Sequence, residues 1–511
     1  MIITLIKSSA LIRKFSLSNV VTPPIGLAYL AGALKSKKID CDVIDGVGLN
    51  LDKISKLDYV DGFGVGLTND EIVDRINPAT DIIGISCMFS SSWSHDFNLI
   101  QKIKKKFPRL KIIVGGEHAT ACAEYLISEF SEIDFCIKGE GEESLPALIN
   151  WIRSHGLNEK CDLPGVVSRF NNRPYFSKEA QRIKIIDQIA WPDWDKIPLE
   201  EYLKRKISHG TSNKSMPILA SRGCPYRCTF CSSPQMWTPL WKARDINDLL
   251  NEMQYYIQKY DVHHFDFFDL TAIIQKKWII SFCQELERRN FKITYQLPSG
   301  TRSEAIDGEV AYWLKRTGCT QMNYAPESGS TETLIRIKKK MQLSRLEKSM
   351  KEVLKQDIKV MCNIILFPHD TVRDLALTFL FMIKASFWGA HDITFVPYVP
   401  YPGSELYEEL RAKNVLPPMS FDYFNSLLIH SDMSKAHSYN PHFSSKMVTI
   451  IKLLFLGTFY ISNFLFRPVR VYYLLRNTLT KTPQTRGEDG LMNLFSKILK
   501  TKSIKGTSYE S

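Results

Sequence analysis

Short apolar segments alternate with amphipathic segments along the first 150 residues of the chain. Residues 1–7 (MIITLIK) and 81–89 (DIIGISCMF) have the length and the β-branched content of buried strands. Between them, residues 25–37 (IGLAYLAGALKSK) repeat apolar positions with the period of a helix. The strands expected from this pattern are 1–7, 40–46, 81–89, 111–118 and 134–142. Since strands that alternate with helices favour a parallel sheet with crossover helices, we predict a doubly wound α/β domain over residues 1–150.

The same alternation returns between residues 206 and 415, after a stretch with a different pattern. The strands expected there are 216–223, 263–269, 292–299, 321–328, 360–368 and 392–400. Six strand–helix units are too few to close a full barrel, so we predict a partial, open-sided one. Residues 151–205 contain a predicted hairpin around Asn171-Asn172 and a segment rich in proline and acid, and we expect them to connect the two domains.

Glycines and acids follow several of the predicted strands of the first domain. Ligands of doubly wound domains lie beyond the carboxyl ends of the strands, which points to Asp45, Ser86 and the turns 115–118 (GGEH) and 139–142 (GEGE). Glycine pairs let the backbone approach a ligand closely, but they also simply make tight turns, and the pattern leaves both interpretations open. The glycines at 62, 64 and 66 lack the spacing of a dinucleotide-binding loop, so we expect an ordinary loop there.

The last region, residues 416–511, is expected to be mostly helical. It contains fourteen uncharged residues (453–466) that follow Lys452 and precede a basic stretch. A membrane span needs about 20 residues, which would require extending this segment back to Met447 and including Lys452. The alternatives are a helix on an anionic membrane surface and a helix that covers the open barrel. Peripheral membrane contact through 447–476 is therefore one expectation.

Composition and charge narrow the classes of protein. The 511 residues, 44% of them apolar, are enough for more than one hydrophobic core. The net charge of +12 suggests nucleic acid, but the basic groups at 102–108 and 336–340 are short and lack stacking aromatic motifs, so we expect no nucleic-acid partner. Eleven cysteines, an odd number, and an N-terminus without a secretory signal indicate a reducing cytoplasm.

Three of the cysteines, Cys224, Cys228 and Cys231, lie in the short segment SRGCPYRCTFCSSP. Three thiolates on one loop can hold three irons of a cubane iron–sulfur cluster and leave the fourth iron free to bind a small molecule. A zinc site normally needs a fourth ligand, and no second CxxC or HxxxH follows. A redox pair of Cys228 and Cys231 would leave Cys224 without a role. The pattern favours the cluster, and a non-catalytic metal site remains the alternative from another class.

The spacing CxxxCxφC, with Phe230 as the aromatic residue φ, resembles the radical S-adenosylmethionine (SAM) enzymes. The resemblance implies a 4Fe-4S cluster on the three cysteines, SAM on the open iron, and one-electron cleavage of SAM to a 5′-deoxyadenosyl radical. Residues 325–330 (APESGS) are similar to the GxESGS segment of these enzymes, whereas residues 366–371 (LFPHDT) depart from their GxPGET turn and lack both glycines. Active groups of such barrels gather at the carboxyl ends of the strands, where Asp269, Glu327 and Ser328 fall, and with Phe230 these are the predicted SAM-side residues.

The segments 23–30 (PPIGLAYL), 115–120 (GGEHAT) and 139–142 (GEGE) resemble the cobalamin-binding domain that precedes the radical SAM domain in one subgroup of these enzymes. That subgroup includes many methyltransferases and the anaerobic magnesium-protoporphyrin monomethyl ester cyclases. The cobalamin contacts that the resemblance implies are Asp45, Ser86, Gly115, Gly116, His118, Gly139, Glu140 and Gly141. The DxHxxG motif is absent, so we expect cobalamin without a histidine lower ligand.

Together these resemblances predict a cobalamin-dependent radical SAM enzyme. Methyl transfer to an unactivated carbon is the leading reaction, and oxidation, cyclisation or ring contraction with the same cofactors is the alternative. The expected partners are a small-molecule or lipid-like substrate and an electron donor such as flavodoxin or ferredoxin. The pattern identifies neither the substrate nor a catalytic side chain.

Overall fold

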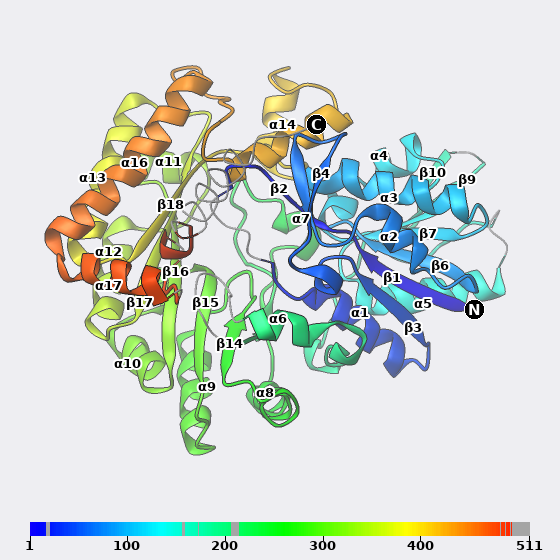
Figure 1. The fold of residues 1–511 in the computed structure, drawn as a ribbon, viewed down its shortest axis with the longest axis horizontal. Coiled ribbons are helices and arrows are strands. Elements are labelled where there is room, and N and C mark those ends of the chain that lie inside the picture. Colours follow the sequence, from blue (N-terminus) through cyan, green and yellow to red (C-terminus); the bar gives the residue numbers. More distant parts are fainter. Residues whose placement is uncertain are drawn as a thin grey trace, which may run out of the picture.

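The computed structural model describes residues 1–16, 21–155, 159–171, 173–205, 214–480, 482–485, 487–490 and 492 (Figure 1). Asn172 of the predicted hairpin, residue 206 at the expected start of the barrel, and the tail 493–511 lie outside the described residues. In Figure 1 the N-terminal sheet, in blue and cyan, lies beside the barrel strands, in green and yellow.

A seven-stranded sheet organises the first domain, in the order β10-β9-β8-β7-β6-β1-β3. Its strands are β1 (Ile2–Lys7), β3 (Cys41–Asp45), β6 (Thr80–Ser86), β7 (Lys111–Gly115), β8 (Phe135–Ile137), β9 (Val166–Phe170) and β10 (Arg173–Phe176). β1, β3, β6, β7 and β8 pair in parallel, and β9 and β10 add an antiparallel hairpin at the edge. β9 and β10 form the hairpin predicted around Asn171-Asn172, and this hairpin extends the first sheet at its edge.

Helices cover both faces of this sheet, which confirms the doubly wound fold. They are α1 (Ile25–Ser36), α2 (Asn69–Asp74), α3 (Trp93–Lys106), α4 (Glu117–Glu129) and α5 (Gly141–Ser154). Alternate side chains of a strand point to opposite faces, so Ile3 and Leu5 of β1 pack in the core with α1 and α5. Ile6 packs in the second core, with α2, α3 and α4.

A small antiparallel sheet, in the order β2-β5-β4, lies beside the first domain; its strands are β2 (Ala10–Ile12), β4 (Ile54–Leu57) and β5 (Gly62–Val65). The loop expected at Gly62 and Gly64 is wrong, because both lie within β5. A Cβ atom at Gly62 would lie 2.9 Å from the carbonyl oxygen of Ile12, and one at Gly64 would lie 3.2 Å from Ser9 Oγ. Glycine here lets the strands approach closely.

Six parallel strands in the order β11-β14-β15-β16-β17-β18 form the predicted partial barrel. They are β11 (Ser215–Ile218), β14 (His264–Phe267), β15 (Thr294–Thr301), β16 (Cys319–Glu327), β17 (Lys359–Leu366) and β18 (Asp392–Pro397). The helices between them are α7 (Ser233–Trp237), α8 (Ile246–Tyr260), α9 (Lys276–Arg288), α10 (Gly308–Arg316), α11 (Thr331–Arg336), α12 (Leu343–Lys355) and α13 (Val372–Trp388). A ribbon of β12 (Ser221–Arg222) and β13 (Lys242–Ala243) flanks the cysteine segment, and α6 (Leu199–Arg205) precedes the barrel.

The C-terminal region contains α14 (Glu405–Ala412), α15 (Phe421–Ser426), α16 (Ser445–Phe466) and α17 (Val469–Thr480). α16 packs along α13 and β18, and it buries Val448, Phe455 and Phe459 against them. Lys452 and Asn463 on the same side donate hydrogen bonds to the backbone carbonyls of Asp432 and Ala390. α16 therefore covers the barrel, and it is also long and apolar enough, by length and composition, to cross a membrane.

Candidate functional site

A mostly apolar cavity lies where the carboxyl ends of β1, β6, β7 and β8 face the barrel. The space inside it, part of which is open to solvent, is about 1300 Å³. The predicted ligand residues that line it are Ser86, Gly115, Gly116, Gly139, Glu140 and Gly141. Ser221, Arg222, Gly223 and Leu270 close it from the barrel side. The cavity thus lies between the two domains.

Glycine backbone forms one wall of this cavity. Gly116 and Gly139 have φ angles of +111° and +74°, which side-chain-bearing residues rarely adopt. A Cβ atom at Gly26 would meet no atom within 4 Å, and one at Gly115 would meet only the carbonyl oxygen of Ile137, at 3.9 Å. Backbone with open space beside it suits a large flat ligand that rests directly on the main chain. The lining therefore fits the corrin ring that the sequence resemblance implies.

Asp45 and His118, two other predicted contacts, do not line the cavity. The Asp45 carboxylate is buried and accepts hydrogen bonds from Tyr202 Oη at 2.6 Å and from the backbone N–H of Val47. His118 is buried, with Nδ1 2.9 Å from Ser90 Oγ and its ring 5.1 Å from that of Trp93. Both side chains point into the protein, although both follow strand ends.

Arg222 joins the two domains at the cavity. Its guanidinium forms ion pairs with Glu140 and Glu142 and lies 4.9 Å from the ring centroid of Tyr29. Glu140 also pairs with Arg182, at 2.8 Å, and its side chain is fully buried. Burial opposes ionisation of Glu142, but the charge of Arg222 outweighs it and keeps the pKa of Glu142 below its ordinary value. Glu142 belongs to the GEGE turn that was expected to face a ligand, whereas Arg222, Tyr29 and Arg182 were not predicted as site residues, although Arg222 stands in the SRGCP segment.

The cysteine loop begins directly after Arg222. Cys224, Cys228 and Cys231 are free and half-buried, and Thr271 Oγ1 lies 3.6 Å from Cys224 Sγ. Burial raises the pKa of Cys228, and raises that of Cys231 to about 11. The Ser232 hydroxyl donates to the Glu117 carboxylate, so the loop also contacts the first domain. Among the described residues, no three His, Cys, Asp or Glu side chains come together as they would around a single metal ion.

Of the predicted SAM-side residues, Phe230 lies within this loop and Glu327 lies beside it. The Phe230 ring is 5.3 Å from that of Phe367, and Lys339 Nζ is 6.0 Å from the Phe230 ring. Lys339 also forms a buried ion pair with Glu327, at 2.7 Å. Glu327 has a φ of +63°, a conformation that costs energy for a residue other than glycine and often occurs at functional sites.

The other two predicted SAM-side residues are engaged inside the barrel. The Asp269 carboxylate accepts from the backbone N–H of Ala220 and from Ser221 Oγ, which links β14 to the strand before the cysteine loop. Ser328 Oγ lies 3.1 Å from Thr378 Oγ1 on α13. Both residues are fully buried, and through these hydrogen bonds they hold the neighbouring segments in place.

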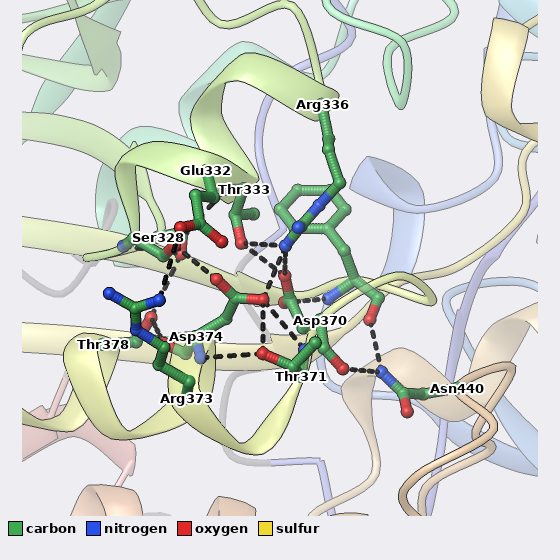
Figure 2. Close-up of polar contacts among 12 residues, drawn as sticks. Ser328, Glu332, Thr333, Arg336, Asp370, Thr371, Arg373, Asp374, Thr378 and Asn440 are labelled. Atoms are coloured by element: carbon green, nitrogen blue, oxygen red, sulfur yellow. Dashed lines mark hydrogen bonds and ion pairs between the residues drawn. The ribbon is translucent and has the colours of Figure 1, made fainter.

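Figure 2 shows how side chains hold the turn after β17, whose residues 366–371 (LFPHDT) include no glycine. Asp370 accepts from the backbone N–H of Phe367 at 2.8 Å and from Thr333 at 2.6 Å. Arg336 pairs with Asp374 at 2.6 Å. Asn440 donates to the carbonyls of Phe367 and Asp370, which brings the C-terminal region to this turn.

Comparisons with known proteins agree with this arrangement of two domains. The B12 binding domain matches residues 18–149, and the Radical SAM superfamily matches residues 218–382. An uncharacterised methyltransferase of Pyrococcus horikoshii is 26% identical over 79% of this chain and 82% of its own length. The anaerobic magnesium-protoporphyrin IX monomethyl ester cyclase of Rubrivivax gelatinosus is 23% identical over 76% of this chain and 67% of its own length.

The fold is also similar to that of a solved structure. The radical S-adenosylmethionine methyltransferase TsrM of Kitasatospora setae, with cobalamin and a 4Fe-4S cluster bound, has a TM-score of 0.61 at 15% identity, covering 81% of this chain and 75% of that one. This likeness concerns the fold alone. The chain therefore has the two domains of a cobalamin-dependent radical SAM enzyme, a B12 binding domain followed by a Radical SAM domain.

Proposed function

We propose that the protein transfers a methyl group to an unactivated carbon of a small or lipid-like molecule, using a 4Fe-4S cluster, SAM and cobalamin. The observation that carries this proposal is the position of the apolar cavity next to the cysteine loop. Arg222 and Gly223, which line the cavity, directly precede Cys224. The methyltransferase among the relatives supports the choice of reaction.

Cys224, Cys228 and Cys231 would hold the cluster. Their thiols lie on one half-buried loop, and the positive charges of Lys339 and Arg302 lie near enough to act on Cys228. These cations would offset the negative charge of a thiolate-bound cluster. When bound, the cluster and SAM supply one-electron radical chemistry, and cobalamin supplies a methyl carrier.

Phe230 and Glu327 would contact SAM, beside the loop. The Glu327 carboxylate would accept hydrogen bonds from the ammonium group of SAM, and Phe230 would pack against its apolar part. Asp269 and Ser328 would act indirectly, since their side chains hold the β11 and α13 ends of the site.

Ser86, Gly115, Gly116, Gly139, Glu140 and Gly141 would surround cobalamin. Apolar walls suit the faces of a corrin, and the open space beside Gly26 leaves room for it. The absence of the DxHxxG motif from the sequence is the ground for proposing a cobalamin without a histidine lower ligand. Asp45 and His118 would act only by holding the neighbouring backbone.

Isotope transfer tests the reaction. The reconstituted, reduced protein is incubated anaerobically with methyl-deuterated SAM and with an extract of host cells that lack the gene. Methyl transfer predicts a product that carries the deuterated methyl group and is heavier than its precursor by one methylene unit, apart from the label. Label confined to SAM and its breakdown products would contradict the proposal.

Oxidation or cyclisation is the second candidate, and it is favoured by one observation, the match to the cyclase of Rubrivivax gelatinosus. The same experiment separates the two reactions, because oxidation gives an unlabelled product that has lost hydrogens. An electron donor such as flavodoxin or ferredoxin is part of either proposal.

A further inference from the structure

Helices α13, α16 and α17 lie at the edge of the barrel away from the N-terminal domain (Figure 1), and each of them exposes large apolar side chains. We call this surface the outer face. It includes Leu380 and Phe387 of α13, Ile461 and Leu465 of α16, and Tyr472 and Leu479 of α17. Leu465 is 74% exposed and Leu479 is 84% exposed. Soluble monomers rarely expose large contiguous apolar patches, so we infer that the outer face binds a partner.

The pattern along α16 is unlike that of an ordinary surface helix. Its exposed residues Met447, Ile450, Leu454, Ile461 and Leu465 recur on one side of the helix, and none of them is charged. A surface helix normally presents charged residues to water on that side. The outer face continues onto α13, because the exposed rings of Phe387 and Phe466 lie 5.3 Å apart. Covering the barrel therefore explains only the buried side of α16.

The charges on these three helices are almost all positive. Their only acidic residue is Asp374, which is buried and pairs with Arg336. Lys384, Lys446 and Arg476 stand three or four positions from the exposed apolar residues of their helices, and therefore on the same side. An apolar surface with cations around it complements a membrane that contains anionic lipid.

We propose that the outer face rests on the surface of an anionic bilayer, with α16 lying in the plane of the interface. α16 does not span in this arrangement, because Lys452 and Asn463 hold its other side to the barrel by hydrogen bonds to backbone carbonyls. Arg467 and Arg470 belong to the fold, since they donate to the carbonyls at the end of α13. The proposal goes beyond the reaction and does not rest on it.

Sedimentation of the full chain with lipid vesicles tests this contact. We expect strong binding to vesicles of phosphatidylcholine and phosphatidylglycerol, and weaker binding to phosphatidylcholine alone. The double variant Ile461→Ser, Leu465→Ser loses apolar area and should bind both kinds of vesicle on the order of tenfold to a hundredfold more weakly. The triple variant Lys384→Gln, Lys446→Gln, Arg476→Gln should bind the anionic vesicles about a hundredfold more weakly and the neutral ones as before.

A matched control is Ile54→Ser, which changes a residue that is 55% exposed on β4 of the small N-terminal sheet, and it should bind like the wild type. Circular dichroism of every variant verifies that it is folded. If the folded wild type binds neither kind of vesicle, the proposal is wrong. Light scattering supplies a second contradicting result. If it finds a dimer that the double variant Ile461→Ser, Leu465→Ser dissociates, and if no variant changes vesicle binding, then a second copy covers the outer face and the proposal is also wrong.

Discussion

Arg222 connects the two domains at the level of a single side chain. It lies between the cavity and the cysteine loop, and its partners Glu140 and Glu142 come from the first domain, about 80 positions earlier in the chain. Because these charged groups are buried, water cannot solvate one of them well when its partner is removed, and the charge that is left destabilises the fold.

Substituting Arg222→Gln should therefore lower the free energy of unfolding by about 3 kcal/mol, since the Glu142 carboxylate loses its cation and Glu140 keeps only Arg182. Urea unfolding of the ligand-free protein measures this loss. Arg288→Gln is the matched control, because Arg288 pairs with Glu285 at the surface, and it should leave the unfolding curve almost unchanged. Equal effects of the two substitutions would show that the Arg222 cluster does not hold the domains together.

His118 gives a second prediction at this scale, which concerns pH. Burial lowers the pKa of His118 from 6.5 to about 3, so the folded protein keeps this ring neutral while the unfolded chain protonates it below about pH 6.5. The unfolded state then binds more protons, and the stability contributed by the neutral ring is lost as the pH falls from about 6.5 toward about 3. Between about pH 7 and about pH 5 this loss is about 2 kcal/mol.

The variant His118→Gln lacks this titration. The difference in unfolding free energy between wild type and variant should therefore shrink by about 2 kcal/mol over that pH range. Every other ionisable group is common to both proteins and cancels in the comparison. A difference that stays constant with pH would show that His118 is not held neutral in the fold.

The turn between β17 and α13 is an element that polar side chains hold in place. Its sequence, LFPHDT, contains no glycine, and the side chains of Asp370, Asp374 and Asn440 bond its backbone (Figure 2). Asn440 is the contribution of the C-terminal region, and its amide satisfies two carbonyls of the turn, those of Phe367 and Asp370.

Replacing Asn440→Ala removes both hydrogen bonds and should lower the free energy of unfolding by about 2 kcal/mol. Hydrogen exchange should become faster at the amides of 367–371, which the lost bonds no longer restrain. Asn150→Ala, on the exposed side of α5, is the control and should change neither quantity. Unchanged exchange in the turn of Asn440→Ala would contradict this role.

The elements themselves were largely predictable, because apolar runs of strand length and amphipathic helices carry their own periodicity. β5 was missed since glycines leave no side-chain pattern to read, and its strand depends on close packing against β2. Ser86, the glycines and Asp45 all stand at the carboxyl ends of strands, and the sequence did not distinguish among them. Ser86 and the glycines line the cavity, whereas the Asp45 side chain points to Tyr202. Arg222 was missed because its ion pairs link residues far apart in the chain.

At the scale of the whole molecule, the first domain and the barrel meet around one apolar cavity. The residues that flank the cysteine loop contact the first domain, Arg222 through Glu140 and Glu142, and Ser232 through Glu117. This places the cysteines and the cavity that fits a corrin next to each other, which is the arrangement that a two-cofactor enzyme requires. The central claim is therefore that radical chemistry begins at this junction.

Quantifying 5′-deoxyadenosine tests that claim most directly. The protein is reconstituted anaerobically with iron, sulfide and hydroxocobalamin, and is then reduced in the presence of SAM. We predict 5′-deoxyadenosine from the wild type and from Cys283→Ser, a buried cysteine outside the loop, and none from Cys228→Ser. Absence of 5′-deoxyadenosine from wild-type protein whose iron and sulfide content verifies a complete cluster would contradict the account.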